Sequence, residues 1–293
     1  MLVEVKRRSV EIHSGDITLS GDIWQPLRGG NQAGVVLLHG FASDRREMAR
    51  PAVELARRGI VALTFDLRGH GQSGGVYAED PVDDVLAAMA MLARQPSVDT
   101  TRLALVGHSI GGRLVLLAAA REPSVSAIVA LAPAGDSNAR ELEGALETLP
   151  IGPVRYPDDY QPYSGKSRQH SRMVASMRQM GYRLTVDWAK MAESWTGTPL
   201  ADVIAAIAPR PLLLVYCLWD NKVSLYDTLS LYCSAGTGRH LLVSPWGVHS
   251  SAYRSALIRW LWITWLTRTL GQPAYRGTRS RVPVLMRRRV GGG

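Results

Sequence analysis

A Gly-x-Ser-x-Gly motif, Gly107-His108-Ser109-Ile110-Gly111, lies between two apolar runs at 103–106 and 114–117. A tight turn from a strand into a helix strains the central serine, so the residues two before and two after it must lack bulk. Gly107 and Gly111 meet that requirement. The pattern predicts that Ser109 is a nucleophile exposed above a sheet, with a purely structural turn as the competing interpretation.

An alcohol is a poor nucleophile unless a base lies within hydrogen-bond reach and a carboxylate orients that base. Of the seven histidines, only His170, His240 and His249 follow Ser109. His170 falls in a long inserted region and His240 opens an expected strand. His249 lies in a loop just past the last expected strand, and we therefore predict it as the base.

The acid is expected at the carboxyl end of a strand near the histidine. Asp220 satisfies this, because it follows the apolar run Leu212 to Cys217. Asp136, shortly after the preceding strand, is the alternative acid, although it could instead cap the first helix of the inserted region. We favour Asp220.

Acyl transfer also needs donors aimed at the developing oxyanion. Two backbone amides are candidates, those of Ile110 after the nucleophile and of Phe41 in the loop after an earlier buried strand. His39 in that loop and His108 in the motif are expected to shape the structure and not to carry protons.

Short runs rich in Val, Ile and Leu alternate with helical patterns, which is typical of crossover units on a parallel sheet. The fold class is therefore α/β, with a mostly parallel central sheet of about eight strands, helices on both faces and a small helical cap insertion. Strands are expected near 34–39, 60–65, 102–107, 126–131, 211–217 and 239–244 after an antiparallel hairpin of 3–12 and 17–24, and helices at 46–58, 81–94, 110–121, 223–232 and 250–269.

The interval between the strands at 126–131 and 211–217 is too long for an ordinary crossover, and it is rich in Tyr, Trp and Met. The expected division is an α/β core at 1–135 and 209–273, a cap at 136–208 and a flexible basic tail at 274–293. A small helical subdomain with its own core and a lid over a pocket are compatible interpretations of the cap.

The composition, with 46% hydrophobic and 20% charged residues, is that of a globular protein. The formal charge of +9 is uneven, because six of the arginines and no acid lie in the tail. The remainder is too mildly basic for a phosphate-binding footprint, so no nucleic-acid partner is expected. Cys217 and Cys233 lack metal-ligand spacing and are expected to be free thiols. No apolar run suits a signal peptide or an integral membrane segment, which favours a cytoplasmic protein.

Together these residues resemble the α/β-hydrolase superfamily, with esterase, dienelactone-hydrolase-like and peptidase-like members, up to about residue 270. The run 65–73 looks like a loop that these enzymes carry, and the resemblance implies an architectural role for its Asp66, Arg68 and His70. The run 209–215 looks like the entry to the acid-bearing strand. Two positions depart from the pattern: Cys217 replaces a common glycine, and no glycine directly precedes His249.

The sequence therefore predicts a serine hydrolase with catalytic Ser109, Asp220 and His249 and an oxyanion hole at Phe41 and Ile110. Its expected substrate is a small, hydrophobic carboxylic ester, and it needs no metal or organic cofactor. Thioesterase, lactonase and aminopeptidase activities remain open because they use the same triad, as does a non-catalytic binding role. The sequence does not indicate the oligomeric state.

Overall fold

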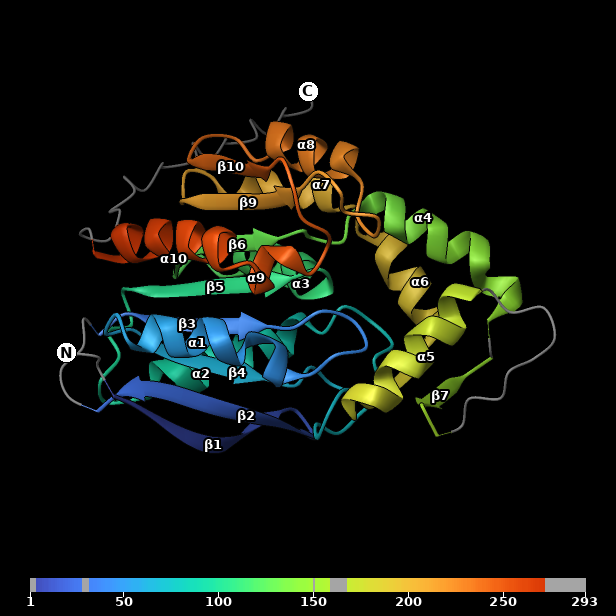
Figure 1. Cartoon of the computed structure of the whole chain (residues 1–293), viewed down its shortest axis with the longest axis horizontal. Coiled ribbons are helices and arrows are strands. Elements are labelled where there is room, and N and C mark those ends of the chain that lie inside the picture. Colours follow the sequence, from blue (N-terminus) through green and yellow to red (C-terminus); the bar gives the residue numbers. More distant parts are fainter. Residues whose placement is uncertain (1–3, 28–31, 150, 159–167, 272–293) are drawn as a thin grey trace, which may run out of the picture.

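The computed structural model describes residues 4–27, 32–149, 151–158 and 168–271. Within these ranges the chain forms a layered core. The inserted segment, between the strands predicted at 126–131 and 211–217, lies at one end of this core (Figure 1). The predicted tail at 274–293, and Tyr160 and Tyr163 of the predicted cap, lie outside the described residues.

An eight-stranded sheet forms the centre of the core, in the order β1-β2-β4-β3-β5-β6-β9-β10. The first two strands pair antiparallel, as does β2 with β4, and the remaining neighbours are parallel. This confirms the predicted fold class. The strands are β1 (Val5–Ser14), β2 (Ile17–Pro26), β3 (Gly34–Leu38), β4 (Val61–Phe65), β5 (Leu103–His108), β6 (Val125–Leu131), β9 (Leu212–Cys217) and β10 (Arg239–Ser244).

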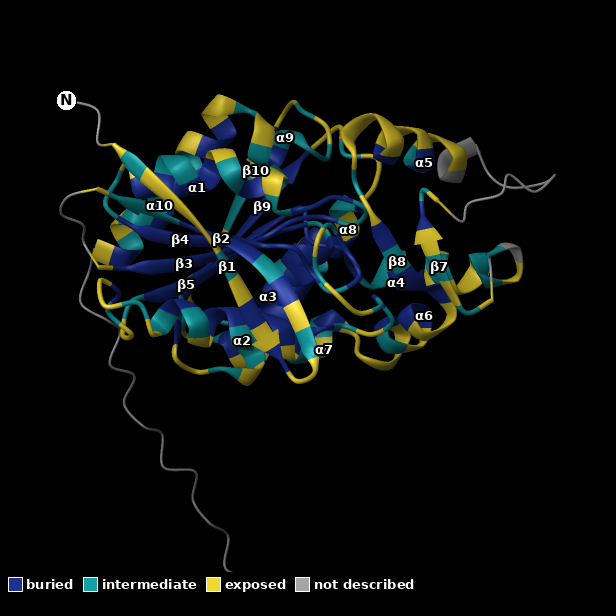
Figure 2. Cartoon of the chain, turned by 90° about the horizontal axis from the view of Figure 1, so that it is seen from below, coloured by how far each residue is buried: buried dark blue, intermediate teal, exposed yellow. Residues whose placement is uncertain are grey.

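Helices cover both faces of this sheet, and buried apolar side chains form one cluster on each face. Figure 2 shows the strands as a buried layer between helices whose outer sides are exposed. One face carries η1 (Arg45–Met48), α1 (Ala49–Ala56), α9 (Ser251–Arg254) and α10 (Ala256–Gly271), and the other carries α2 (Val82–Ala93), α3 (Ile110–Arg121) and α8 (Leu225–Ser234).

The strands β3, β4, β5 and β9 are almost entirely buried because helices cover both of their faces. Their short, continuous apolar runs are the sequence signature of such strands. Because parallel strands all end at the same edge, the loops after β3, β5, β9 and β10 meet there, and these are the loops that hold the predicted site residues.

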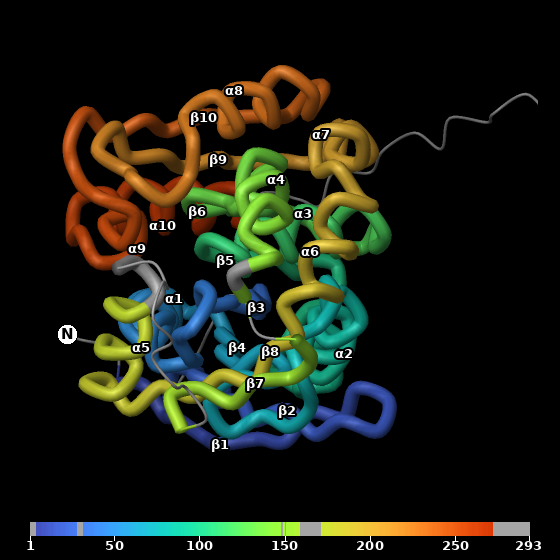
Figure 3. Tube along the Cα trace, turned by 90° about the vertical axis from the view of Figure 1, so that its right-hand side faces the viewer, coloured from blue at the N-terminus to red at the C-terminus, as the bar shows by residue number. Residues whose placement is uncertain are grey.

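The inserted segment lies at that same edge (Figure 3). It is mixed and not purely helical, because two four-residue strands pair antiparallel within it. Isolated bridges from His70 to Leu184 and from Tyr77 to Val186 join the second of these strands to core loops. The segment contains α4 (Asp136–Ala145), η2 (Leu146–Thr148), β7 (Pro153–Tyr156), α5 (Arg168–Met180), β8 (Leu184–Asp187), α6 (Trp188–Gly197), α7 (Leu200–Val203) and η3 (Ile204–Ile207).

The single helix predicted at 250–269 is wrong, because it is divided into α9 and α10 at Ser255. Ser255 has extended backbone angles of φ −63° and ψ 126°. The remaining predicted strands and helices match the structure to within a few residues. None of the helices in the described ranges is both long and apolar enough to cross a membrane.

Candidate active site

Ser109 lies between β5 and α3 in a strained turn, with φ 56° and ψ −117°. A β-carbon at Gly107 would lie 2.0 Å from the carbonyl oxygen of Gly111, and one at Gly111 would lie 2.6 Å from that of His39. Side chains at either position would therefore prevent the turn. Because positive φ is costly for a residue with a β-carbon, this strain is consistent with a functional position.

Asp220 and His249 come together from the loops that follow β9 and β10. The His249 Nδ1–H donates to Asp220 Oδ2 at 2.7 Å, and the Asp220 side chain is fully buried. The other carboxylate oxygen of Asp220 accepts the amides of Lys222 and Val223 at 2.8 and 3.1 Å. The carboxylate is thereby fixed, and only Nε2 of His249 remains for a substrate or nucleophile.

The electrostatics suit a base and its orienting acid. Burial raises the pKa of Asp220, but hydrogen bonding and charge attraction to His249 outweigh it, so the pKa lies below its usual 3.8. Burial, together with the neighbouring His108, lowers the pKa of His249 below 6.5 despite the opposing effect of Asp220. At neutral pH the acid is therefore ionised and the imidazole is free to accept a proton.

The turn of residues 107–111 around Ser109, called the elbow below, lies next to the predicted base, His249. The ring centroid of His108, the residue before Ser109, lies 4.5 Å from that of His249. The Ser109 hydroxyl itself makes no hydrogen bond with any described residue, and catalytic hydrogen bonds are often loose without substrate.

The loop after β3 lies directly against the elbow. A β-carbon on Gly40 would be 2.9 Å from Nδ1 of His108 and 3.4 Å from Cβ of Ser109. The Gly40 and Ala42 amides donate to Glu47 and to His70. Within the described part of the chain, the Phe41 and Ile110 amides have no hydrogen-bond acceptor, as a pair of oxyanion donors requires.

The alternative acid and the alternative bases lie elsewhere. Asp136 is the first residue of α4, whose N-cap is Gly135, and its carboxylate accepts the amide of Leu200 at 2.8 Å. His240 lies on β10 with its ring centroid 5.5 Å from that of Trp265. His170 belongs to α5, but its side chain is outside the described part of the structure.

The residues 65–73 form an ion-paired support against the loop 39–42 after β3, which carries the Phe41 amide and is called the oxyanion loop below for its predicted role. Arg45 donates to Asp66 and to Asp22, and Arg68 donates to Asp84 at 2.6 and 2.7 Å. Burial lowers the pKa of His70 to about 3, so its ring is neutral. These contacts suit an architectural role.

A hollow of about 850 Å³ beside this support contains none of the predicted catalytic residues. Three of its four arginines are paired with Asp22, Asp44 or Asp66. No group of three or more His, Cys, Asp or Glu side chains in the described residues is arranged to hold a metal ion. Cys217 and Cys233 are free thiols, as predicted.

Sequence reasoning missed Glu47 and treated His108 only as part of the elbow. Glu47 lies on η1 and accepts hydrogen bonds from His108 and Gly40 at 2.8 and 2.9 Å. A carboxylate at the start of an amphipathic helix carries no sequence signal for a partner 61 positions away.

A mostly parallel eight-stranded sheet with a serine elbow after β5 defines a member of the α/β-hydrolase superfamily. Solved structures agree with this class. The α/β hydrolase GrgF from Penicillium sp. sh18 superposes with a TM-score of 0.70 at 22% identity, covering 91% of this chain and all of that one. The chain also resembles the crystal structure of hypothetical protein PA2218 from Pseudomonas aeruginosa, with a TM-score of 0.70 over 90% of this chain and 93% of that one.

The family follows from the sequence comparison. The family model described as serine aminopeptidase, S33, matches residues 29–186, more than half of the chain, and the chain belongs to this family. PA2218, an uncharacterized protein, is 27% identical across 81% of this chain and 73% of its own length. Thiohydrolase apmlB of Arthrinium phaeospermum is 25% identical across 61% of this chain and 68% of its own length.

Proposed function

We propose that the protein is a serine hydrolase that cleaves carboxylic ester bonds of small, hydrophobic substrates through an acyl-enzyme. Ser109 attacks the carbonyl carbon, His249 accepts the serine proton and returns it to the leaving alcohol, and Asp220 holds the imidazole. Water then attacks the acyl-enzyme, with His249 again as the base. This step releases the carboxylic acid and restores the Ser109 hydroxyl. The 2.7 Å hydrogen bond between His249 and Asp220, next to the strained Ser109 elbow, carries this proposal.

The oxyanion that forms in each step would be held by the amides of Phe41 and Ile110. Their backbones are fixed before substrate binds, since Phe41 lies between two anchored amides and Ile110 is the first residue of α3. Such donors stabilise the developing charge without reorganisation during the reaction.

Aromatic side chains of the inserted segment support a hydrophobic substrate. The Trp188 ring of α6 packs 5.4 Å from Phe41 of the oxyanion loop, and its indole N–H donates to the Tyr156 hydroxyl. Apolar surface next to the oxyanion donors favours an acyl or alcohol group without charge.

Thioester hydrolysis is the second candidate, because one relative is named a thiohydrolase and the same nucleophile and oxyanion hole serve a thioester. Aminopeptidase activity, which the family description suggests, would require recognition of a free amino group. Lactonase activity would use the same triad.

The test is labelling with a fluorophosphonate together with turnover of p-nitrophenyl butyrate. Ser109→Ala is expected to abolish labelling and to lower kcat by about 10⁴-fold or more. Ser250→Ala is a matched control, because Ser250 adjoins His249 but its side chain caps no helix amide. The Ser250→Ala variant should keep both the fluorophosphonate labelling and the turnover of p-nitrophenyl butyrate.

A panel of esters, acyl thioesters and amino-acid amides then separates the candidate activities. Esters are expected to give the highest kcat/KM. If the wild-type protein neither labels nor turns over any member of the panel, a binding role replaces the enzyme.

A further inference from the structure

One buried carboxylate contacts two parts of the proposed catalytic machinery. Glu47 Oε1 accepts the amide of Gly40, in the oxyanion loop, at 2.9 Å and the Nδ1–H of His108, in the elbow, at 2.8 Å. The side chains of Glu47 and His108 are only 6% and 5% exposed. A displacement of Glu47 would therefore move the oxyanion loop and the elbow together.

His108 extends this network to the base. Its Nε2 lies 3.3 Å from the backbone carbonyl oxygen of His249. A carboxylate and a carbonyl can only accept hydrogen bonds, so both ring nitrogens of His108 must carry protons for both contacts to be hydrogen bonds. Hydrogen bonds at both ring nitrogens together would make His108 an imidazolium.

Two nearby histidines provide an internal contrast. His39 accepts the Leu67 amide at Nε2, and His70 accepts the Ala42 amide at Nε2. In both, Nδ1 donates to a backbone carbonyl, of Gly40 and Arg68 respectively. A ring with one donor and one acceptor nitrogen is neutral, so His108 differs from these two in its partners.

We propose that Glu47 and His108 form a charged positioning pair that holds the oxyanion loop, the nucleophile elbow and the His249 loop in one arrangement, with His108 as a doubly protonated ring beside the base. This inference rests on the proposed serine-hydrolase function and adds two residues to its machinery. Neither touches the reacting atoms, and both act through Gly40, Ser109 and His249.

The positive charge proposed for His108 affects the pKa of the neighbouring His249. The charged and titratable groups that act on His249 are Asp220 from the β9 loop, His108 at the end of β5 and Glu47 on η1. Tyr253 on α9 packs against His108, with ring centroids 4.7 Å apart. Burial raises the pKa of Tyr253 far above its usual value, so that group stays neutral. Asp220 and Glu47 favour protonation of His249, whereas His108 opposes it.

The first test is the substitution His108→Gln, which removes the cation and keeps hydrogen-bonding atoms. Loss of a positive charge, with Glu47 left unpaired, raises the pKa of His249. The acidic limb of kcat/KM is expected to move upward by about one pH unit. NMR titration of the His249 ring should show the same movement.

The second test separates positioning from stability. Glu47→Ala is expected to lower kcat by about 10- to 100-fold with a much smaller change in KM, because misplaced donors weaken the transition state more than substrate binding. Glu47→Gln keeps an acceptor for Gly40 and should recover part of that loss. The ¹⁵N shifts of His108 should change from those of an imidazolium to those of a neutral ring in Glu47→Gln.

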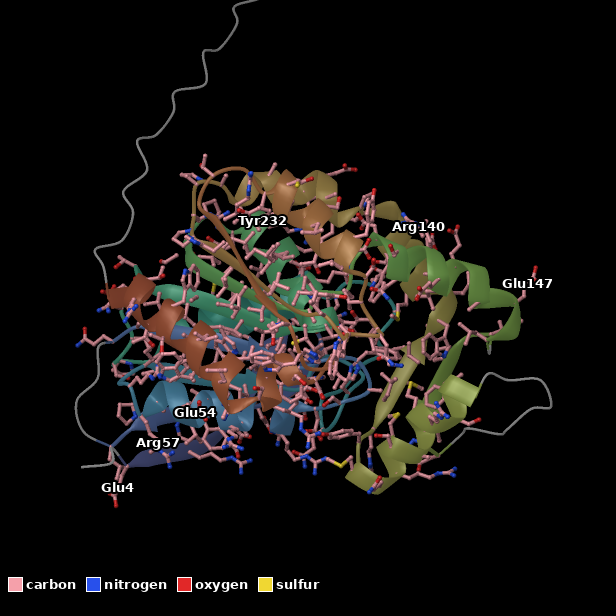
Figure 4. All side chains as sticks on the ribbon, turned by 45° about the horizontal axis from the view of Figure 1, so that its top comes forward. Glu4, Glu54, Arg57, Arg140, Glu147 and Tyr232 are labelled. Carbon is pink, nitrogen blue, oxygen red and sulfur yellow. The ribbon has the colours of Figure 1, made fainter. Side chains whose placement is uncertain are left out.

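Glu54→Gln is the matched control. Glu54 lies on α1 on the side of the molecule away from the inserted segment (Figure 4), where it pairs with the buried Arg259 at 2.8 Å. Its substitution should lower thermal stability and leave kcat unchanged.

A neutral His108 in the wild-type protein at pH 7, or an unchanged His249 titration in His108→Gln, would overturn the inference. Both are NMR observations that need no turnover. If the wild type hydrolyses no acyl substrate, the proposed function fails, and the two spectra still decide whether the charged pair exists.

Discussion

At the scale of single residues, the choice between two aspartates depends on their contacts. Both Asp220 and Asp136 follow a strand of the main sheet. Asp220 accepts the Nδ1–H of His249, whereas Asp136 accepts backbone amides at the start of α7. Only Asp220 is therefore placed to orient the base.

Asp220→Asn is expected to lower kcat by about 10⁴-fold, because the amide would favour the wrong tautomer of His249. Asp136→Asn is the control and should keep kcat within a few-fold while lowering the melting temperature. The comparison is made with purified variants on p-nitrophenyl butyrate. Equal losses in the two variants would contradict the assignment of Asp220.

The pH dependence follows from the direction of the His249 pKa. The base must be unprotonated, and burial and His108 hold its pKa below 6.5. Activity is therefore expected to be complete at pH 7 and to fall only as the pH drops below 6.5, through the lowered pKa. The measurement is kcat/KM from about pH 4 to about pH 8, where an acidic limb above 6.5 would contradict the electrostatic picture.

The sequence indicated Ser109, Asp220 and His249 because each follows a recognisable strand, and position after a strand is a local property. It could not indicate the roles of Glu47 and His108. Their contacts with one another and with Gly40 and His249 depend on how three separate loops meet at the sheet edge.

At the scale of elements, Arg113 of α3 joins the nucleophile helix to the inserted segment. It is fully buried, pairs with Asp80 before α2 at 2.9 Å, and donates to the carbonyls of Trp195 and Thr198 at the end of α6. Its guanidinium also lies 5.2 Å from the Trp195 ring. Arg113 therefore links the end of α6 to the helix that follows Ser109.

Arg113→Met is expected to destabilise the protein by about 3 kcal/mol or more, because it leaves the buried carboxylate of Asp80 without its partner. Arg121→Met, at the exposed end of the same helix, removes only a 3.6 Å surface pair with Asp83. That control should cost less than about 1 kcal/mol. Chemical denaturation gives both values, and similar costs would show that Arg113 is not a structural anchor.

Two regions of the chain also show where sequence periodicity was insufficient to predict the elements. The helix expected at 250–269 breaks because carbonyls near the end of α9 accept side-chain donors from α10. The Trp262 indole donates to Ala252, and the Arg259 guanidinium donates to Tyr253 and Arg254. The strands β7 and β8 are only four residues long, too short for alternation to stand out in the surrounding helical sequence.

At the scale of the whole molecule, the net positive charge and the proposed chemistry occupy different parts of the chain. The arginine-rich segment 274–293 follows all the proposed catalytic residues, and the described structure contains the proposed triad and both proposed oxyanion donors. The described fold that carries them ends with α10, at Gly271. Catalysis and the basic segment should therefore be separable.

Deletion of 274–293 is expected to leave kcat/KM for p-nitrophenyl butyrate within about two-fold of wild type, since every proposed catalytic residue precedes this segment. A deeper truncation that begins at 266 is the control, because it removes the buried Leu266 and Leu270 from the cluster on the α1 and α10 face. Loss of two buried leucines costs about 2–5 kcal/mol each, so the deeper truncation should melt at a markedly lower temperature. A large loss of activity in the shorter deletion, with an unchanged melting temperature, would instead place the basic segment in substrate binding.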